Sequence, residues 1–444
     1  MDLWYKRAVT ETAQGSTSRP QLVRAIGRWS LTALTINSVI GSGVFGLPST
    51  LAGLMGRASP LAVLFAGACM AVIMACFAEV ASYFSEAGGP YLYARIAFGR
   101  LMGIQTGWML WLAQAAAPAA NANLFVIYLA EFWPQARNPA PRFLVLTALV
   151  GLLAVVNVRG VRAGTQVSNL FTAAKLLPLS VVILVGIIAI IKGHATPSLS
   201  PTAFHANELM KAMLLGVFAY GGFETALTPM GEAKNPRRDT VFALFATLVS
   251  CALIYALIQW VVVELLPNAA RSDRPLADVA RLMMGHNGAA LVTIGALVSF
   301  YGYLSAKILA TPRVTFALAE SGDFPKAFAA VHSRFHTPYI SILIFAALVW
   351  LFSLGGSFAW NLTLSAVARL FYYGVGCAAL PMLRQKRPGG ALFHLPGGRV
   401  FAILGVTICV VLLTRVDLTQ SVILIATIGV ALLNWVWVTR GRAR

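Results

Sequence analysis

Long apolar runs alternate along this chain with short breaks that are polar or rich in Gly and Pro. Because about 20 apolar residues in a helix cross the hydrocarbon core of a bilayer, each run predicts a membrane-spanning helix. The pattern therefore predicts an all-α polytopic membrane protein with twelve transmembrane helices. The predicted spans lie at about 29–53, 61–84, 101–133, 142–158, 166–191, 208–231, 238–266, 286–319, 339–355, 358–383, 399–414 and 418–439.

Two of these spans, the first and the sixth, carry a pair of glycines near the middle, within residues 38–45 and 218–224. A helix interruption at membrane depth is tolerated only where it is buried in protein or lines a cavity. The two spans open two five-span halves, 29–192 and 207–384, and such matched interruptions are typical of inverted-repeat transporters. Alternatively, the glycines serve only the close packing of helices.

An interrupted span has a simple chemical consequence. The N-terminus of a half-helix presents unpaired N–H groups and partial positive charge, whereas unwound carbonyls and half-helix C-termini carry partial negative charge. The first suits a carboxylate and the second an ammonium group. Two such breaks together would fit a zwitterion.

Composition and charge exclude an ordinary soluble protein. Hydrophobic residues make up 58% of the chain, charged residues 11%, and the mean hydropathy is +0.76, whereas a soluble domain carries about 25% charged residues. The net charge of +19 would indicate nucleic acid in a soluble protein, but this chain lacks a solvated basic face. Nucleic acid is therefore not an expected partner.

The basic residues instead indicate topology. With a cytoplasmic N-terminus, 22 Lys and Arg fall on the inner side, nine on the outer side and three within spans, as the positive-inside rule requires. The sequence thus predicts a plasma (inner) membrane protein with both termini in the cytoplasm. The polar tail 1–28 has no signal-peptide pattern, and the last two spans occupy 399–439.

No cofactor or metal site is predicted. The five cysteines lie within apolar runs, and the six histidines lie in loops or at span ends without the spacing of metal ligands. A short amphipathic helix at 88–99, an outer helical loop at 270–284 and a basic connector at 324–338 complete the expected organisation.

Several motifs, in order along the chain, resemble those of amino acid permeases of the amino acid-polyamine-organocation superfamily. They are the Gly-Ser-Gly-Val-Phe of 41–45, 78–80, the Glu-Ala-Gly-Gly-Pro-Tyr of 86–91, 218–224, 234–238, 312–313 and the Ser-Gly-Asp-Phe-Pro of 321–325. The resemblance implies a leucine-transporter-type fold of five plus five inverted spans, with two extra C-terminal helices. It also implies alternating access around a central amino acid site.

Similarity to the arginine/agmatine antiporters implies where the substrate binds. It places carboxylate contacts at Ser42 and the Gly43 amide, and amine contacts at the backbone carbonyls of Val39, Phe218 and Gly221. Phe218 also matches an aromatic gate, but those antiporters have tryptophan there, so no clamp for a guanidinium is implied. In the first break the implied substrate-binding positions are Val39, Ile40, Gly41, Ser42 and Gly43.

Span three carries three residues spaced i, i+4, i+7 on one helical face: Gln114, Pro118 and Asn121. They either line the side-chain pocket or form interhelical hydrogen bonds, which contribute roughly 0.6 kcal/mol each on average. The resemblance supports Gln114 and Asn121 as pocket residues and offers no match for Pro118.

Lys175, early in span five, is an ionisable group inside the membrane and so a candidate for function. Many proton-coupled or sodium-independent members of the superfamily have a lysine here, in the place of a sodium ion in sodium-driven relatives. Lys175 then either exchanges a proton during transport or is a permanent structural cation. Both alternatives predict sodium-independent transport.

Four further ionisable residues lie within spans. Glu224 matches an acidic residue that belongs to gating and pH response in the antiporters; alternatively, it caps the second half-helix. Glu79 is expected in a structural ion pair. Lys307 aligns with a substrate-facing position, where a cation favours an anionic or small polar substrate side chain; alternatively, it pairs with an intramembrane glutamate. Arg369 is given the same pairing interpretation and no substrate role.

The sequence thus predicts a secondary transporter of amino acids, sodium-independent, working as a proton symporter or an exchanger. Its expected partners are a small-molecule amino acid, protons in the symport alternative, and the lipid bilayer. The rival is a polytopic membrane transferase, but the loops show no converging acid/base residues. A channel would need a repeated filter segment, which the sequence does not show.

Overall fold

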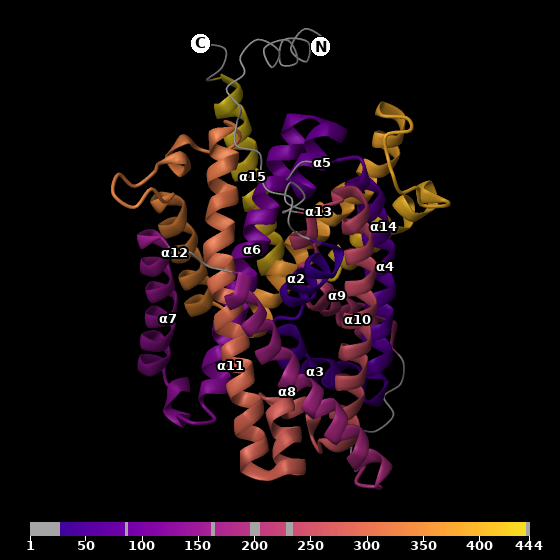
Figure 1. Ribbon diagram of the computed structural model, residues 1–444, viewed down its shortest axis with the longest axis vertical. Coiled ribbons are helices and arrows are strands. Elements are labelled where there is room, and N and C mark those ends of the chain that lie inside the picture. The colour runs from indigo at the N-terminus through magenta and orange to yellow at the C-terminus, as the bar shows by residue number, and fades with distance from the viewer. Residues whose placement is uncertain (1–26, 85–87, 161–164, 196–204, 228–233, 441–444) are drawn as a thin grey trace.

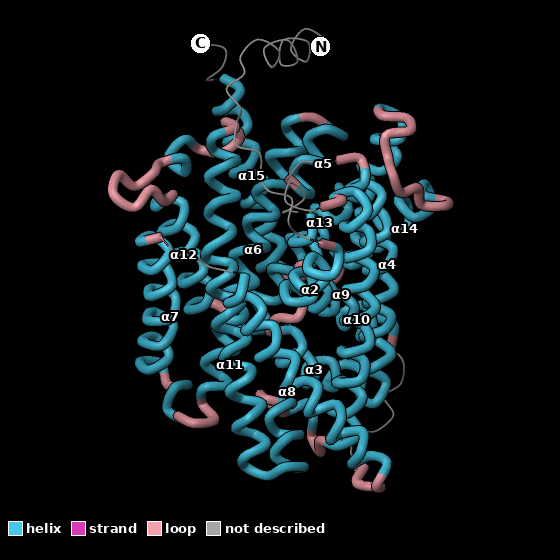
Figure 2. Tube along the Cα trace, viewed as in Figure 1, coloured by secondary structure: helices cyan, strands magenta, loops and turns pink. Residues whose placement is uncertain are grey.

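The computed structural model describes residues 27–84, 88–160, 165–195, 205–227 and 234–440. Within these ranges the chain forms helices joined by loops and no strand (Figure 2), so the prediction of an all-α protein is confirmed. The predicted tail up to residue 26 and the motif residues Glu86 and Ala87 lie outside the described residues.

The helices follow the predicted order. The first span consists of α2 (Arg28–Val39) and α3 (Gly43–Met55), and the sixth of α9 (Ala206–Tyr220) followed by the 3-10 turn η3 (Phe223–Leu227). The other helices are α4 (Ser59–Ser82), α5 (Gly89–Phe98), α6 (Arg100–Leu129), α7 (Pro139–Arg159), α8 (Thr165–Ile191), α10 (Pro236–Leu265), α11 (Pro275–Glu320), α12 (Tyr339–Gly355), α13 (Phe358–Lys386), α14 (Gly398–Leu413) and α15 (Leu418–Arg440).

Among the described residues, seven helical stretches are long and apolar enough to cross a membrane, and three shorter apolar helices accompany them. The predicted boundaries of spans three and eight differ from the structure by four residues or more. Helix α6 ends at Leu129 rather than 133, and Trp133, which precedes Pro134, has the non-helical dihedrals φ −136° and ψ 84°. Helix α11 contains residues 275–284 of the predicted outer helical loop as well as span eight, joined through a kink at Gly285 (φ 67°).

The long helices run along the longest axis of the molecule (Figure 1). Helix α6 packs against α13 and α11, α10 packs against α4 and α2, and α7 lies beside α12 at one edge. Helix α6 is mostly buried, whereas α15 exposes large apolar side chains such as Ile425 and Leu433. Because such a surface is costly in water, these outer faces are suited to lipid.

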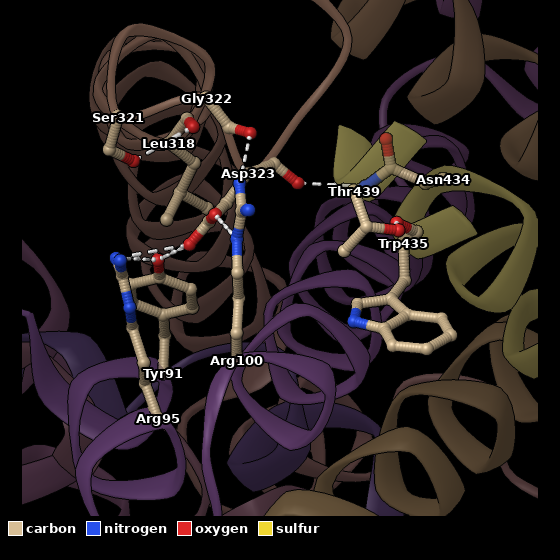
Figure 3. A network of polar contacts seen from close by, with 10 residues as sticks. All are labelled: Tyr91, Arg95, Arg100, Leu318, Ser321, Gly322, Asp323, Asn434, Trp435 and Thr439. Carbon is tan, nitrogen blue, oxygen red and sulfur yellow. Dashed lines mark hydrogen bonds and ion pairs between the residues drawn. The ribbon is translucent and has the colours of Figure 1, made fainter. Parts of the chain in front are cut away.

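Buried Asp323, just after α11, joins three segments at one end of the molecule (Figure 3). Its carboxylate accepts hydrogen bonds from Arg100 Nε at 2.6 Å and from the Tyr91 hydroxyl, and pairs with Arg95 Nη1 at 3.1 Å. Asn434 of α15 donates to the Asp323 carbonyl at 2.7 Å. Burial and the bond to Asp323 raise the pKa of Tyr91 to about 12, so Tyr91 stays a protonated donor.

The short helix predicted at 88–99 is thus confirmed as α5, and this network ties it to α6, α11 and α15. A second ion pair lies at the ends of α4 and α13, where Arg384 Nε and Nη2 each lie 2.7 Å from the carboxylate of Glu79. The amide of Leu395 also donates to Glu79 at 2.8 Å. The structural ion pair expected for Glu79 is confirmed.

Candidate functional site

The first break lies between α2 and α3. Ile40 leaves the helix with φ −72° and ψ 91°, and Ser42 precedes the first residue of α3. Both residues are fully buried, and Ser42 Oγ has no hydrogen-bond partner among the described residues. Since the first N–H groups of a helix lack acceptors one turn earlier, this end of α3 offers donors for an anion.

The second break lies at Gly221 and Gly222, after α9. Gly222 has φ +112°, which a residue with a side chain rarely adopts, and a Cβ there would lie 2.6 Å from the carbonyl oxygen of Ser38. The Ser38 and Thr225 hydroxyls are hydrogen-bonded at 2.6 Å. The two interruptions predicted from the sequence are therefore present, and the fold brings them into contact.

Tyr255 of α10 bridges the same two breaks. Its hydroxyl lies 3.2 Å from the Val39 carbonyl oxygen and 3.0 Å from that of Ala219. Sequence reasoning missed this residue. The available signal was a hydroxyl within an apolar span, since a buried tyrosine O–H usually finds a partner.

Lys175 of α8 closes the C-terminal end of α2. Its Nζ donates to the carbonyls of Asn37 and Ile40, each at 2.8 Å, and the side chain is almost fully buried. The last carbonyls of a helix have no intrahelical donor and carry partial negative charge, so a cation is stabilised there. The structure thus places the ammonium group of Lys175 directly on the first break.

Glu224 lies at the second break and is surrounded by donors. Oε2 accepts the N–H of Gly222 at 2.7 Å, while Oε1 accepts from Arg369 Nη1 at 2.7 Å and from the Tyr373 hydroxyl at 3.0 Å. The Tyr372 hydroxyl also donates to Oε1. The pairing expected for Arg369 is confirmed, and Glu224 satisfies a backbone N–H of the break as well.

Arg369 also explains why residue 221 of the second break is a glycine. A Cβ on Gly221 would lie 2.4 Å from Arg369 Nη1, so the guanidinium packs directly over this residue. Arg369, Tyr372 and Tyr373 all come from α13, at spacings of three and four residues that place them on one face. This spacing could have revealed the two tyrosines from the sequence.

The two amides of span three differ in their position. Asn121 Oδ1 lies 3.9 Å from the position that a Cβ on Gly41 would occupy. This oxygen has no hydrogen-bond partner among the described residues, whereas Nδ2 of the same side chain donates to the Ala117 carbonyl at 2.9 Å. The structure therefore brings Asn121 to the first break. Gln114 lies about two turns earlier on the same face, is partly exposed, and its Oε1 has no partner in the described part of the chain.

The ring of Tyr303 connects Lys307 of α11 to the first break. Its Nζ is 5.4 Å from the centre of the Tyr303 ring, and that ring lies 3.5 Å from the Cβ position of Gly41. Lys307 is only 8% exposed, yet no ion pair of the described residues includes it. Lys307 also interacts electrostatically with Glu224, whose carboxylate lies 2.7 Å from Arg369 Nη1, whereas Glu79 pairs with Arg384.

The carbonyls implied for amine binding are partly engaged. The Phe218 carbonyl accepts the N–H of Gly221 at 3.1 Å, and that of Val39 lies near Tyr255. A carbonyl oxygen has two lone pairs, so each retains capacity for a second donor. The Phe218 side chain is buried at the end of α9, and its role as a gate stays a prediction.

Comparison with known proteins identifies the family. A family model described as amino acid permease matches residues 26–438. The chain belongs to this amino acid permease family. It is 27% identical over 435 residues to a methylthioribose transporter of Bacillus subtilis, covering 92% of each chain. It is 25% identical over 440 residues to a branched-chain amino acid permease of the same organism, covering 92% of this chain and 91% of the relative.

An uncharacterised transporter of Mycobacterium tuberculosis is 27% identical over 378 residues, which cover 80% of this permease and 78% of the relative. These relatives are named as transporters or permeases, which agrees with the predicted membrane transport function. The permease is therefore a multi-pass membrane protein that transports small molecules across the bilayer.

Proposed function

We propose that this permease is a secondary active transporter of amino acids in the cell membrane, working by alternating access as a proton symporter or an exchanger. The observation that carries the proposal is the contact between the two interrupted spans at Gly222 and Ser38. Twelve spans in a five-plus-five inverted repeat, with two further C-terminal helices and both termini cytoplasmic, form the proposed architecture.

The two breaks offer complementary charge to a zwitterion. The α-carboxylate binds at Ser42 Oγ and the Gly43 amide, where the N-terminus of α3 favours an anion. The ammonium group binds the carbonyls of Val39, Phe218 and Gly221, where helices end and leave acceptors. Asn121, which faces Gly41, lines the side-chain pocket together with Gln114.

Transport does not require sodium in this proposal. The ammonium group of Lys175 already places a positive charge at the carbonyls of Asn37 and Ile40, so a sodium ion at the same place would be repelled. Glu224 and Phe218 act in gating, because both lie at the second break, which must move against the first for the site to open on either side.

Uptake by purified protein in liposomes tests the function. A panel of radiolabelled amino acids, with methylthioribose added because one relative is named for it, is measured with imposed proton or sodium gradients and with internal unlabelled amino acid. We expect uptake driven by protons or by internal substrate and unaffected by replacing sodium with potassium. Transfer or hydrolysis of a substrate without uptake would instead support the transferase alternative.

A further inference from the structure

The buried charges around the two breaks do not balance. The described residues place three cations there, Lys175, Lys307 and Arg369, against the single carboxylate of Glu224. Charged groups within a membrane are costly unless they are paired. An unbalanced cation at a substrate site is therefore informative about what the substrate supplies.

Two of the three cations have their compensation within the protein. Lys175 donates to two carbonyls at the end of α2. Arg369 is paired with Glu224 at 2.7 Å and lies within hydrogen-bond distance of the Tyr373 hydroxyl at 3.3 Å. Lys307 is therefore the cation whose charge remains to be compensated.

Lys307 has weaker compensation. Its ammonium group faces the ring of Tyr303 at 5.4 Å, a cation–π distance, and Glu224, the carboxylate with which it interacts electrostatically, is already paired with Arg369. Aromatic rings attract cations through their quadrupole, but a carboxylate at contact distance compensates a buried charge far better.

The position of Lys307 connects it to the proposed substrate. Tyr303, one turn before it on α11, lies against Gly41, and the unpaired oxygen of Asn121 lies beside the same glycine. Gly41 adjoins Ser42, the proposed anchor of the α-carboxylate. The Tyr303 ring thus lies against the residue next to that anchor and also faces the ammonium group of Lys307.

We infer that the preferred substrates are acidic amino acids, whose side-chain carboxylate pairs with Lys307 while the α-carboxylate binds at Ser42 and Gly43. This inference rests on the proposed amino acid transport. A cationic side chain would be repelled by Lys307 and Arg369, and an amide side chain would leave Lys307 without a carboxylate of its own.

Competition uptake in liposomes tests the inference. Unlabelled L-aspartate, L-glutamate, L-asparagine, L-glutamine and L-leucine compete against a transported label, and the half-inhibitory concentration of each is measured. We expect the acids to compete at least about tenfold better than their amides, equivalent to about 1.4 kcal/mol. Lys307→Met should remove this advantage, whereas Lys307→Arg should retain most of it because the charge remains.

Lys211→Met serves as the matched control, since this lysine is half exposed at the start of α9 and pairs with Glu208. In this variant the amino acids should compete in the same order as in the unchanged protein. Membrane yield and elution on size exclusion verify folding. If Lys307→Met does not fold, the order in which the amino acids compete for the unchanged protein and for Lys307→Arg still tests the preference for acidic substrates.

Different failures have different meanings. An unchanged protein that transports neutral amino acids without preferring acids would overturn the inference and leave the proposed function intact, whereas a protein that carries no amino acid would refute the function itself. A folded Lys307→Met that loses acids and amides equally would also overturn the inference, because Lys307 would then serve the α-carboxylate common to both.

Discussion

At the scale of single residues, buried charges are stabilised in three different ways. Lys175 is held by backbone carbonyls, Arg369 by a carboxylate, and Lys307 by an aromatic ring. The sequence identified all three as costly groups within spans, because position in an apolar run is visible in the sequence. Their partners come from other spans and could not be read from local spacing.

Replacing Lys175 should reduce transport strongly. In Lys175→Met the carbonyls of Asn37 and Ile40 lose the ammonium donor, and loss of a hydrogen bond at a buried group such as the Ile40 carbonyl costs about 1–3 kcal/mol. We expect uptake to fall roughly tenfold or more, while Lys192→Met, at an exposed position after α8, leaves it unchanged. The pH profile of residual uptake separates the two roles: a flattened profile indicates proton coupling by Lys175, and an unchanged one a structural cation.

Removing one member of the Arg369–Glu224 pair should destabilise the protein. Arg369→Met leaves a buried carboxylate without its cation, and breaking such a pair costs about 3–5 kcal/mol. Thermal unfolding in detergent should show a clear drop in Tm for this variant. The double variant Arg369→Met with Glu224→Gln should recover much of the loss, and equal instability of the single and double variants would contradict a charge-based cause.

At the scale of elements, the two interrupted spans depend on how closely their backbones approach. Glycine patterns located both breaks in the sequence, because the glycine pairs lie at matching positions in the two predicted halves, where a backbone either bends or approaches another closely. Tyr255, which joins the two breaks, gave no comparable pattern. Its role depends on α10 lying against α2, a packing that spacing does not reveal.

A methyl group at Gly222 should prevent the two breaks from meeting. In Gly222→Ala the Cβ would lie 2.6 Å from the Ser38 carbonyl, in addition to backbone strain of about 1–3 kcal/mol from its φ of +112°. We expect loss of uptake. Gly193→Ala is the matched control, because Gly193 also has a positive φ (+82°) but has no atom within 4 Å of the Cβ position; it should keep uptake. Similar uptake by both variants would argue against the contact.

At the scale of the whole molecule, polar networks at one end hold together helices that are distant in the sequence. Asp323 joins α5, α6 and α15 to the end of α11 (Figure 3), and Glu79 joins α4 to α13. The sequence predicted that Glu79 forms a structural ion pair but not which residue is its partner, and it did not predict the Asp323 network. Both depend on side chains more than 200 residues apart.

Asp323→Asn should therefore loosen this end of the protein. The amide replaces an anion that accepts from Arg100 and Tyr91, and hydrogen bonds to a charged group contribute about 1.5–3 kcal/mol. We expect a lower Tm in detergent. Asp273→Asn, in an exposed pair with Arg137, should change the Tm little, since exposed pairs contribute about 0–1 kcal/mol. An equal effect of both substitutions would contradict the importance of burial.

The sequence alone determined the all-helical membrane class, the position of the two breaks and the residues whose charge or missing side chain needed an explanation. These properties follow from local composition, because apolar length, glycine position and buried charge each carry a cost that can be assessed one segment at a time. Only the tertiary structure decided the partners: Lys175 with the end of α2, Arg369 with Glu224, and Lys307 with Tyr303. Such pairings depend on which helix faces are in contact, and that is fixed by the packing of the whole chain.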